Sequence, residues 1–193
     1  IGFGQKTYIP DDNFEQELIN LGYDNVLDNY VNTSSIDTVL TLNIAFKQIT
    51  DLTGIEDFTN LTSLECSHNP LAKLDVSQNT ALTHLGCGNM VSDTNLTNLD
   101  VSQNTALTHL GLYNQYRITS LDLIQNTALI YLMCMRTQLT TLDLSKNPAL
   151  TYLDCRDNQL RSLDVSGATA LTELLCEGNK FDCDALKKKI DLD

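Results

Sequence analysis

The chain has 193 residues, of which 42% are hydrophobic and 19% are charged, a composition typical of globular proteins. Its formal net charge of −13 at pH 7 would repel phosphate backbones and anionic lipid headgroups. Its longest apolar runs fall far short of the roughly 18 residues that a membrane span needs. We therefore expect neither nucleic acid as a partner nor direct insertion into a membrane.

Residues 1–38 are predicted to form an N-terminal tail and a helical cap. The opening residues IGFGQ lack the basic segment and apolar core of a signal peptide. They are interpreted as the remnant of a signal peptide that has been removed, with a cloning remnant as the alternative. After Pro10, Asp12 and Glu15 resemble a capping box. The apolar residues that follow at helical spacing, and that complete a short amphipathic helix over the first turn, are Phe14, Leu18 and Leu21.

Residues 39–181 repeat with a period of about 21 residues. The sequence LTSLECSHNPLAKLDVSQNTA begins at Leu61, after a divergent first copy that begins at Val39, which makes about seven copies. Later copies begin at Leu82, Leu107, Leu129, Leu150 and Leu171, at intervals of 21, 25, 22, 21 and 21 residues. A fixed period near 20 residues indicates a solenoid. Two copies carry extra residues, within 89–95 and near 115–117, at one register, which predicts loops on one edge.

Each repeat divides into two halves in which apolar and polar residues alternate. Leu64 and Cys66 alternate with polar residues in the first half, and Leu74 and Val76 flank Asp75 in the second. This period of two predicts two short parallel strands in each turn, one on each side of the coil, with little helix between them. The predicted fold class is therefore a repeat solenoid that is mainly β.

Residues 182–193 are predicted to form a short C-terminal helix that closes the last turn. Asp184 is placed at the N-cap, Leu186 and Ile190 face inward, and the lysines at 187–189 lie favourably near the C-terminus of the helix. A terminal repeat needs such a cover because no neighbouring repeat buries its outer face.

Five cysteines share one position of the repeat, and the copy that begins at Leu107 fills that position with Leu112. They are Cys66, Cys87, Cys134, Cys155 and Cys176. A position that accepts leucine belongs to the apolar core. Neighbours across a parallel sheet lie about 4.8 Å apart, whereas the Cβ atoms of a disulfide lie about 3.8 Å apart. We therefore expect a ladder of free thiols without a metal. Cys183 lies outside the ladder, and a bond from it to Cys176 stays open.

Two polar residue types recur at the turns and on the second half of the repeat. Stacked asparagine amides are expected to hydrogen-bond the backbone of the bends, at Asn69, Asn158 and Asn179 and at Asn79, Asn104, Asn126 and Asn147. An outward column of carboxylates is formed by Asp75, Asp100, Asp122, Asp143 and Asp164. Hydrogen bonds from serine and threonine hydroxyls or backbone amides are expected to compensate their repulsion, with calcium as the alternative.

The pattern LTxLxCxxNxLxxLDVSxNTA resembles the 21-residue class of bacterial leucine-rich repeats. With cysteine in place of the usual leucine it is similar to internalins that carry a cysteine ladder. The segment TYIPDDNFEQELINLGYD is similar to the N-terminal cap of a group of bacterial surface proteins. The resemblance covers about residues 39–181 and implies a right-handed leucine-rich-repeat coil, export to the cell surface or medium, and adhesion or recognition. It does not name a ligand.

The outward positions of the first strand are informative because core packing does not dictate them. Aromatic residues, methionine and arginine gather there in the middle repeats, which is typical of an interface core. The candidate partner-binding residues are His84, His109, Tyr113, Tyr131, Met133, Met135, Arg136, Tyr152 and Arg156. Scattered surface residues that favour strands are the alternative interpretation. The two histidines lack a third converging ligand, so no zinc site is predicted.

The sequence indicates a recognition module that is not an enzyme. It contains no nucleophile with its base, no paired carboxylates in a cleft and no cofactor loop, so no cofactor is expected. The predicted function is recognition or adhesion by a monomer that binds a protein through its concave face. A polysaccharide-binding module and a structural spacer within a larger surface protein are the alternatives.

Overall fold

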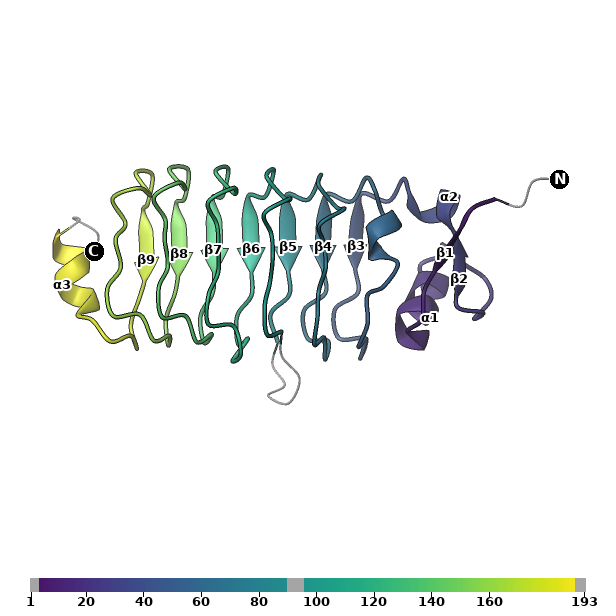
Figure 1. Cartoon of the computed structure of the whole chain (residues 1–193), viewed down its shortest axis with the longest axis horizontal. Coiled ribbons are helices and arrows are strands. Elements are labelled where there is room, and N and C mark those ends of the chain that lie inside the picture. The colour runs from purple at the N-terminus through teal and green to yellow at the C-terminus, as the bar shows by residue number, and fades with distance from the viewer. Residues whose placement is uncertain (1–3, 90–95, 190–193) are drawn as a thin grey trace.

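The computed structural model describes residues 4–89 and 96–189. The loop predicted within 89–95 therefore lies outside the described residues except for Asn89, and so does Ile190. Figure 1 shows an elongated coil whose strands lie side by side in chain order, with helices at both ends. None of the described helices is long and apolar enough to span a membrane.

One parallel sheet of seven strands runs the length of the coil, and neighbouring strands pair in register. The strands are β3 (Thr41–Asn43), β4 (Ser63–Glu65), β5 (His84–Gly86), β6 (His109–Gly111), β7 (Tyr131–Met133), β8 (Tyr152–Asp154) and β9 (Glu173–Leu175). The central leucine of every strand is buried and the flanking residues of most strands face outward, as the period of two predicts. The predicted leucine-rich-repeat solenoid is confirmed.

The second row of strands, predicted on the other side of the coil, is reduced to a single bridge between Asp143 and Asp164 within the described residues. The cause is local. The Oδ1 atom of Asp143 accepts a hydrogen bond of 2.8 Å from the backbone N–H of Ser145, and equivalent bonds recur in the other repeats. This turn bends the backbone away from the extended conformation that a longer strand needs.

The interior of the coil contains columns of leucine and cysteine, as expected. Leu112 and the ladder cysteines are buried. The free thiols are Cys66, Cys87, Cys134 and Cys155. Burial raises the pKa of the Cys87 and Cys155 thiols to about 12, so they behave as small hydrophobic groups at neutral pH.

Asparagine ladders fix both bends of the coil. Asn158 donates from Nδ2 to the carbonyl oxygens of Cys134 and Cys155, and its Oδ1 accepts from the backbone N–H of Leu139. On the other bend, Asn126 is fully buried and donates to the carbonyl oxygens of Val101 and Asn104. The predicted role of these amides is therefore confirmed.

The N-terminal cap combines a hairpin of β1 (Lys6–Tyr8) and β2 (Tyr30–Asn32) with α1 (Asp12–Asn20) and the short α2 (Thr33–Ile36). The predicted capping box of Asp12 and Glu15 is wrong, because Asp11 is the N-cap and accepts from the backbone N–H groups of Asn13 and Phe14. The other carboxylate oxygen of Asp11 accepts from the backbone N–H of Thr50 at 2.8 Å. One aspartate thus starts the helix and attaches it to the first repeat, which also contains the 3-10 turn η1 (Ile55–Asp57).

The C-terminal cap is α3 (Cys183–Lys189), and Leu186 packs against the core as predicted. The backbone N–H of Ala185 donates to the Asp182 carboxylate, so the prediction of Asp184 as the cap is wrong. A disulfide joins Cys176 to Cys183, so the last rung of the ladder is not a free thiol. This bond closes the end of the solenoid covalently.

Candidate functional site

Four rings form a continuous stack on the outward face of the sheet, here called the strand face. This ring stack consists of His84, His109, Tyr131 and Tyr152, one from each of four adjacent strands. The centroids of the two imidazoles lie 4.3 Å apart, and those of the two phenols lie 4.4 Å apart with planes inclined by 8°. The middle pair, His109 and Tyr131, is separated by 5.8 Å. In-register pairing brings together four of the predicted binding residues.

Threonine hydroxyls contact Nδ1 of both stacked histidines. The Thr108 hydroxyl donates its proton to the carbonyl oxygen of Thr83 at 2.9 Å. When the hydroxyl keeps this bond, its 2.9 Å contact with Nδ1 of His109 is donated by the imidazole. Thr83 and His84 repeat this arrangement one strand earlier. In that arrangement Nδ1 carries the proton of the neutral imidazole and Nε2 is a hydrogen-bond acceptor.

Partial burial changes the pKa of three rings of the stack. It lowers the pKa of His109, with a further decrease from the adjacent His84. It raises the pKa of Tyr131, and it raises that of Tyr152 to about 12. The phenols are therefore neutral at physiological pH, where the hydroxyl groups can both donate and accept.

An open hollow of about 360 Å³ lies beside the ring stack and is called the strand-face hollow. Gly86 and Gly111, at the outward positions of β5 and β6, line it between larger neighbours. The side chains around it come from four successive repeats and are Ser63, Glu65, Ser67, His84, His109, Tyr113, Tyr131 and Met133, together with the strand leucines. Neither glycine contributes a side chain of its own to this part of the sheet.

Each of three glycines near the hollow has a different environment. A Cβ at Gly86 would overlap the carboxylate of Glu65, and a Cβ at Gly88 would lie 2.5 Å from the Tyr113 ring. Side chains from neighbouring repeats thus occupy the space beside these two glycines. A Cβ at Gly111 would meet no atom within 4 Å, so this glycine leaves space open. The open space belongs to the strand-face hollow.

A second aromatic group, which the sequence did not predict, lies at the edge of the strand face. The Tyr113 hydroxyl lies 3.0 Å from Nε2 of His68, and the His68 ring stacks on Phe46 with centroids 4.0 Å apart. Phe46 remains 67% exposed. Both Phe46 and His68 have positive φ angles at the end of the strand segment, where the chain turns. Tyr113 thus connects the candidate site to this edge.

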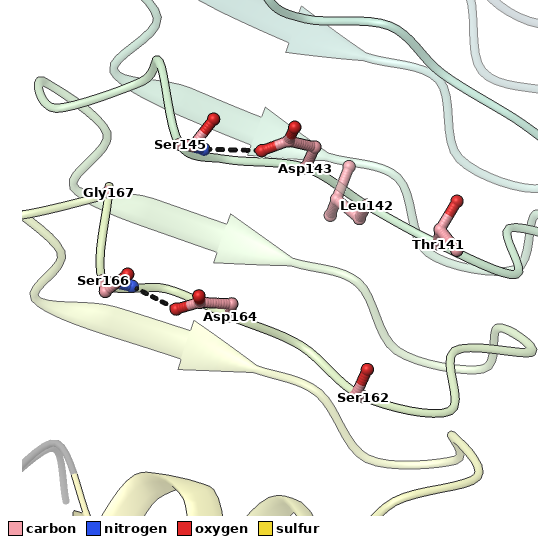
Figure 2. A pocket seen from close by; sticks show the side chains of 8 residues that line it. All are labelled: Thr141, Leu142, Asp143, Ser145, Ser162, Asp164, Ser166 and Gly167. Carbon is pink, nitrogen blue, oxygen red and sulfur yellow. Dashed lines mark hydrogen bonds between the residues drawn. The ribbon is translucent and has the colours of Figure 1, made fainter.

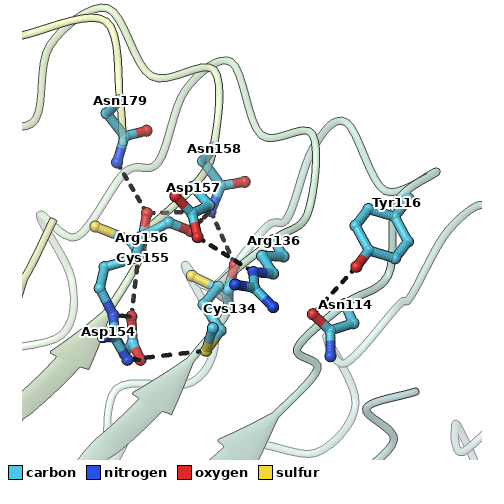
Figure 3. Close-up of polar contacts among 11 residues, drawn as sticks. Asn114, Tyr116, Cys134, Arg136, Asp154, Cys155, Arg156, Asp157, Asn158 and Asn179 are labelled. Atoms are coloured by element: carbon cyan, nitrogen blue, oxygen red, sulfur yellow. Dashed lines mark hydrogen bonds and ion pairs between the residues drawn. The ribbon is translucent and has the colours of Figure 1, made fainter. Parts of the chain in front are cut away.

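Arg156 lies on the strand face, but its positive charge is paired with a carboxylate of the same chain. Its guanidinium makes a bidentate ion pair with Asp154, at 2.9 Å from Nε to Oδ1 and 2.7 Å from Nη2 to Oδ2 (Figure 3). Asp154 is fully buried, so the pair neutralises a carboxylate that would otherwise lack compensation. A third contact, of 3.9 Å, reaches the sulfur of Met135.

Arg136 lies apart from the ring stack, although its backbone N–H donates to the carbonyl oxygen of Arg156. It occupies a left-handed turn, with a φ of 53°, and its Nε lies 3.2 Å from the carboxylate of Asp157 (Figure 3). The same turn position carries Asn114 in the preceding repeat. The structure therefore places Arg136 on the loop edge rather than within the ring stack.

The opposite side of the coil carries the aspartate column above shallow hollows. Figure 2 shows one of them, where Asp143 and Asp164 each accept a hydrogen bond from the backbone N–H two residues ahead. Such bonds from Ser102 and from Ser145 lower the pKa of Asp100 and of Asp143. The expected compensation of the column is confirmed. Among the described residues, no three histidine, cysteine or acidic side chains are grouped as metal ligands.

Comparison with known proteins supports the resemblance seen in the repeat. The chain is 41% identical to internalin J of Listeria monocytogenes over 73 residues, which are 38% of this chain and 8% of that protein. The functional domain of InlJ from Listeria monocytogenes, which includes a cysteine ladder, matches with a TM-score of 0.74 and 34% identity. The chain is an internalin-like leucine-rich-repeat protein. No family model matches it.

This internalin-like chain spans less than the full length of its relatives. The match to InlJ covers 99% of the chain and 47% of the InlJ domain. Internalin C2 of Listeria monocytogenes shares the fold with a TM-score of 0.66 and 21% identity, over 96% of this chain and 94% of that one. A leucine-rich-repeat protein of Leptospira interrogans has a TM-score of 0.72 and 23% identity, over 83% and 43%.

Proposed function

We propose that this chain is a non-enzymatic recognition and adhesion module that binds a protein through its strand face, the face that we expected to be concave. The ring stack is the observation that carries the proposal. It presents His84, His109, Tyr131 and Tyr152 on adjacent strands, and a hollow lies beside it. Partly exposed tyrosines held rigidly at the centre of a surface tend to provide most of the binding free energy of an interface.

We also propose that the module acts as a monomer outside the cell, secreted or on the cell surface. The disulfide between Cys176 and Cys183 supports an oxidising compartment, because the cytosol keeps most thiols reduced. The internalin-like repeat supports the same location. The net charge of −13 disfavours a nucleic acid or an anionic lipid surface as the partner.

The proposed function is tested by a double variant, Tyr131→Ala with Tyr152→Ala, in capture of cell-surface proteins and on a glycan array. We expect capture of a protein, and we expect the double variant to weaken it by about 30-fold or more, as for loss of two interface aromatics. The free energy of unfolding should change little, because both side chains are partly exposed.

The matched control carries Asp100→Asn with Asp122→Asn, on the opposite side of the coil. It should leave affinity within about twofold, since exposed charges away from an interface contribute little. Equal losses from both double variants, or loss from the aspartate pair alone, would move the site to the other side. Binding to glycans without capture of any protein would overturn the proposal.

A further inference from the structure

The strand-face hollow has a distinctive set of polar groups. Its lining contains one carboxylate, two imidazoles and two phenols, and it contains no lysine or arginine. The nearby Arg156 does not alter this balance, because its positive charge is paired with the Asp154 carboxylate through contacts of 2.7 and 2.9 Å. The only formal charge in the lining at neutral pH is therefore negative.

The imidazoles of His84 and His109 line this hollow. When Thr83 and Thr108 donate their hydroxyl protons to the backbone carbonyls, the Nδ1 protons are used in the contacts with the same hydroxyls and Nε2 is an acceptor. Nε2 of His84 and of His109 makes no hydrogen bond to a described residue. Each atom therefore offers a lone pair to a ligand that brings a proton.

The Glu65 carboxylate adds a negative charge at one side of the hollow. Its Oε1 accepts from the backbone N–H of Ser67 at 3.0 Å, which fixes the side chain. Its Oε2 makes no hydrogen bond to a described residue, and the carboxylate lies over Gly86 in the space that a Cβ would take. The Glu65 carboxylate is thus held in place, and no lysine or arginine among the described residues forms an ion pair with it.

We propose that the strand-face hollow binds a basic side chain, lysine or arginine, that projects from the protein partner. The inference rests on the proposed function and names the chemistry of its partner. An ammonium or guanidinium group supplies donors only, which matches the acceptors of Glu65, His84 and His109. Its positive charge is complementary both to Glu65 and to the net charge of −13. The space over Gly111 admits the aliphatic stem.

The test uses small probes and the amide resonances of the whole chain in solution. Nα-acetyl-lysine methylamide and Nα-acetyl-arginine methylamide should shift the resonances of Gly86 and Gly111 in a saturable way. Nα-acetyl-norleucine methylamide has the same aliphatic stem without the charge, and it should leave them unchanged. Equal shifts from norleucine would make the hollow an apolar site and overturn the proposal.

Two variants locate the site and its charge. Gly111→Leu fills the open space, and leucine already occupies the same column at Leu175, so the fold should accept it. It should abolish binding of the lysine probe, whereas the control Asn43→Leu, in the same column outside the hollow, should not. Glu65→Gln keeps an acceptor for Ser67 and should weaken binding by about two- to fivefold. Unchanged binding in Gly111→Leu would overturn the proposed location.

The proposed function and this inference fail in different ways. Saturable shifts from glucose or N-acetylglucosamine, without shifts from lysine or arginine, would overturn the basic-side-chain proposal in favour of a glycan. Protein capture that is lost in the tyrosine double variant but unaffected by Gly111→Leu would also overturn it, while the proposed function would stand. Binding of the lysine probe without capture of any protein would instead overturn the proposed function, on which the basic-side-chain proposal rests.

Discussion

Cys183 of α3 is bonded to Cys176, the last rung of a cysteine ladder whose other members are free. The bond lies where the solenoid has no further repeat to bury its outer face. The bond attaches the C-terminal helix to the turn that the helix covers. Cys176 therefore belongs to the core and also anchors the cap. Leu186 of the same helix packs against the core.

We expect the denatured protein to contain four reactive thiols without a reductant and six with one. Cys183→Ala should lower the free energy of unfolding by about 2 kcal/mol, because the bond closes a short loop of chain. Thiol titration and urea unfolding measure the two quantities. Six reactive thiols without a reductant would show that the bond is absent in solution.

The cysteine ladder should tolerate leucine but not serine. Cys134→Leu introduces the residue that the preceding repeat carries at this position, Leu112. The free energy of unfolding of the variant should therefore change by less than about 1.5 kcal/mol. Cys134→Ser should lower it by about 1–3 kcal/mol, because a hydroxyl would be buried in an apolar column. Urea unfolding compares the two variants. A greater loss from leucine than from serine would contradict this account of the core.

The buried asparagine ladder is expected to contribute strongly to stability. Asn126→Leu removes two donors at once and leaves the carbonyl oxygens of Val101 and Asn104 without them. We expect a loss of about 2–4 kcal/mol in the free energy of unfolding. The control, Gln103→Ala, changes an exposed residue and should stay within about 0.5 kcal/mol. Similar losses from both variants would contradict a specific role of the buried amide.

The aspartate column predicts a loss of stability in acid. Hydrogen bonds from Ser77 and Ser102 lower the pKa of Asp75 and of Asp100 below the ordinary value of 3.8. Because the folded pKa is the lower one, the stabilisation is present above about pH 4 and is lost as the pH falls through the folded pKa. Unfolding in urea between pH 5 and pH 2.5 should show this decrease. Asp75→Asn with Asp100→Asn should make the decrease smaller, and an unchanged pH dependence would contradict it.

The repeat allowed most of the fold to be predicted from the sequence. A fixed period places equivalent residues such as Leu64 and Leu85 on neighbouring strands, so the register and the core follow directly. The prediction of a second row of strands failed because the alternation of apolar and polar residues does not reveal competing local hydrogen bonds. The aspartate and serine in the LDVS segments, as at Asp75 and Ser77, form a turn instead.

The candidate site could be predicted in part, for the same reason. In-register pairing places Tyr131 beside Tyr152, and the sequence predicted their proximity. It did not predict the contact of Tyr113 with His68, because that contact depends on a side chain crossing Gly88 toward an earlier repeat. The alternation of apolar and polar residues also does not reveal the positive φ angles at the loop edge. These angles place His68 near the site and Arg136 away from it.

The stacked histidines predict that binding of a basic probe depends on pH. Burial and the adjacent His84 lower the pKa of His109 below its ordinary value of 6.5. The groups that line the hollow around this imidazole are Glu65 of β4, His84 of β5 and Tyr131 of β7. As the pH falls through its folded pKa, the His109 imidazole gains a proton, which leaves both ring nitrogens as donors and adds a positive charge.

Binding of the lysine probe should therefore be strongest above about pH 7 and should weaken as the pH falls toward 5. The stability contributed by neutral His109 is lost in the same direction, because its folded pKa is the lower one. In His84→Ala the pKa of His109 should rise, since the neighbouring charge is gone, whereas His68→Ala should leave it unchanged. Proton NMR titration of the imidazole resonances measures both values. A His109 pKa that does not respond to His84→Ala, or lysine binding that strengthens in acid, would contradict the assigned proton positions.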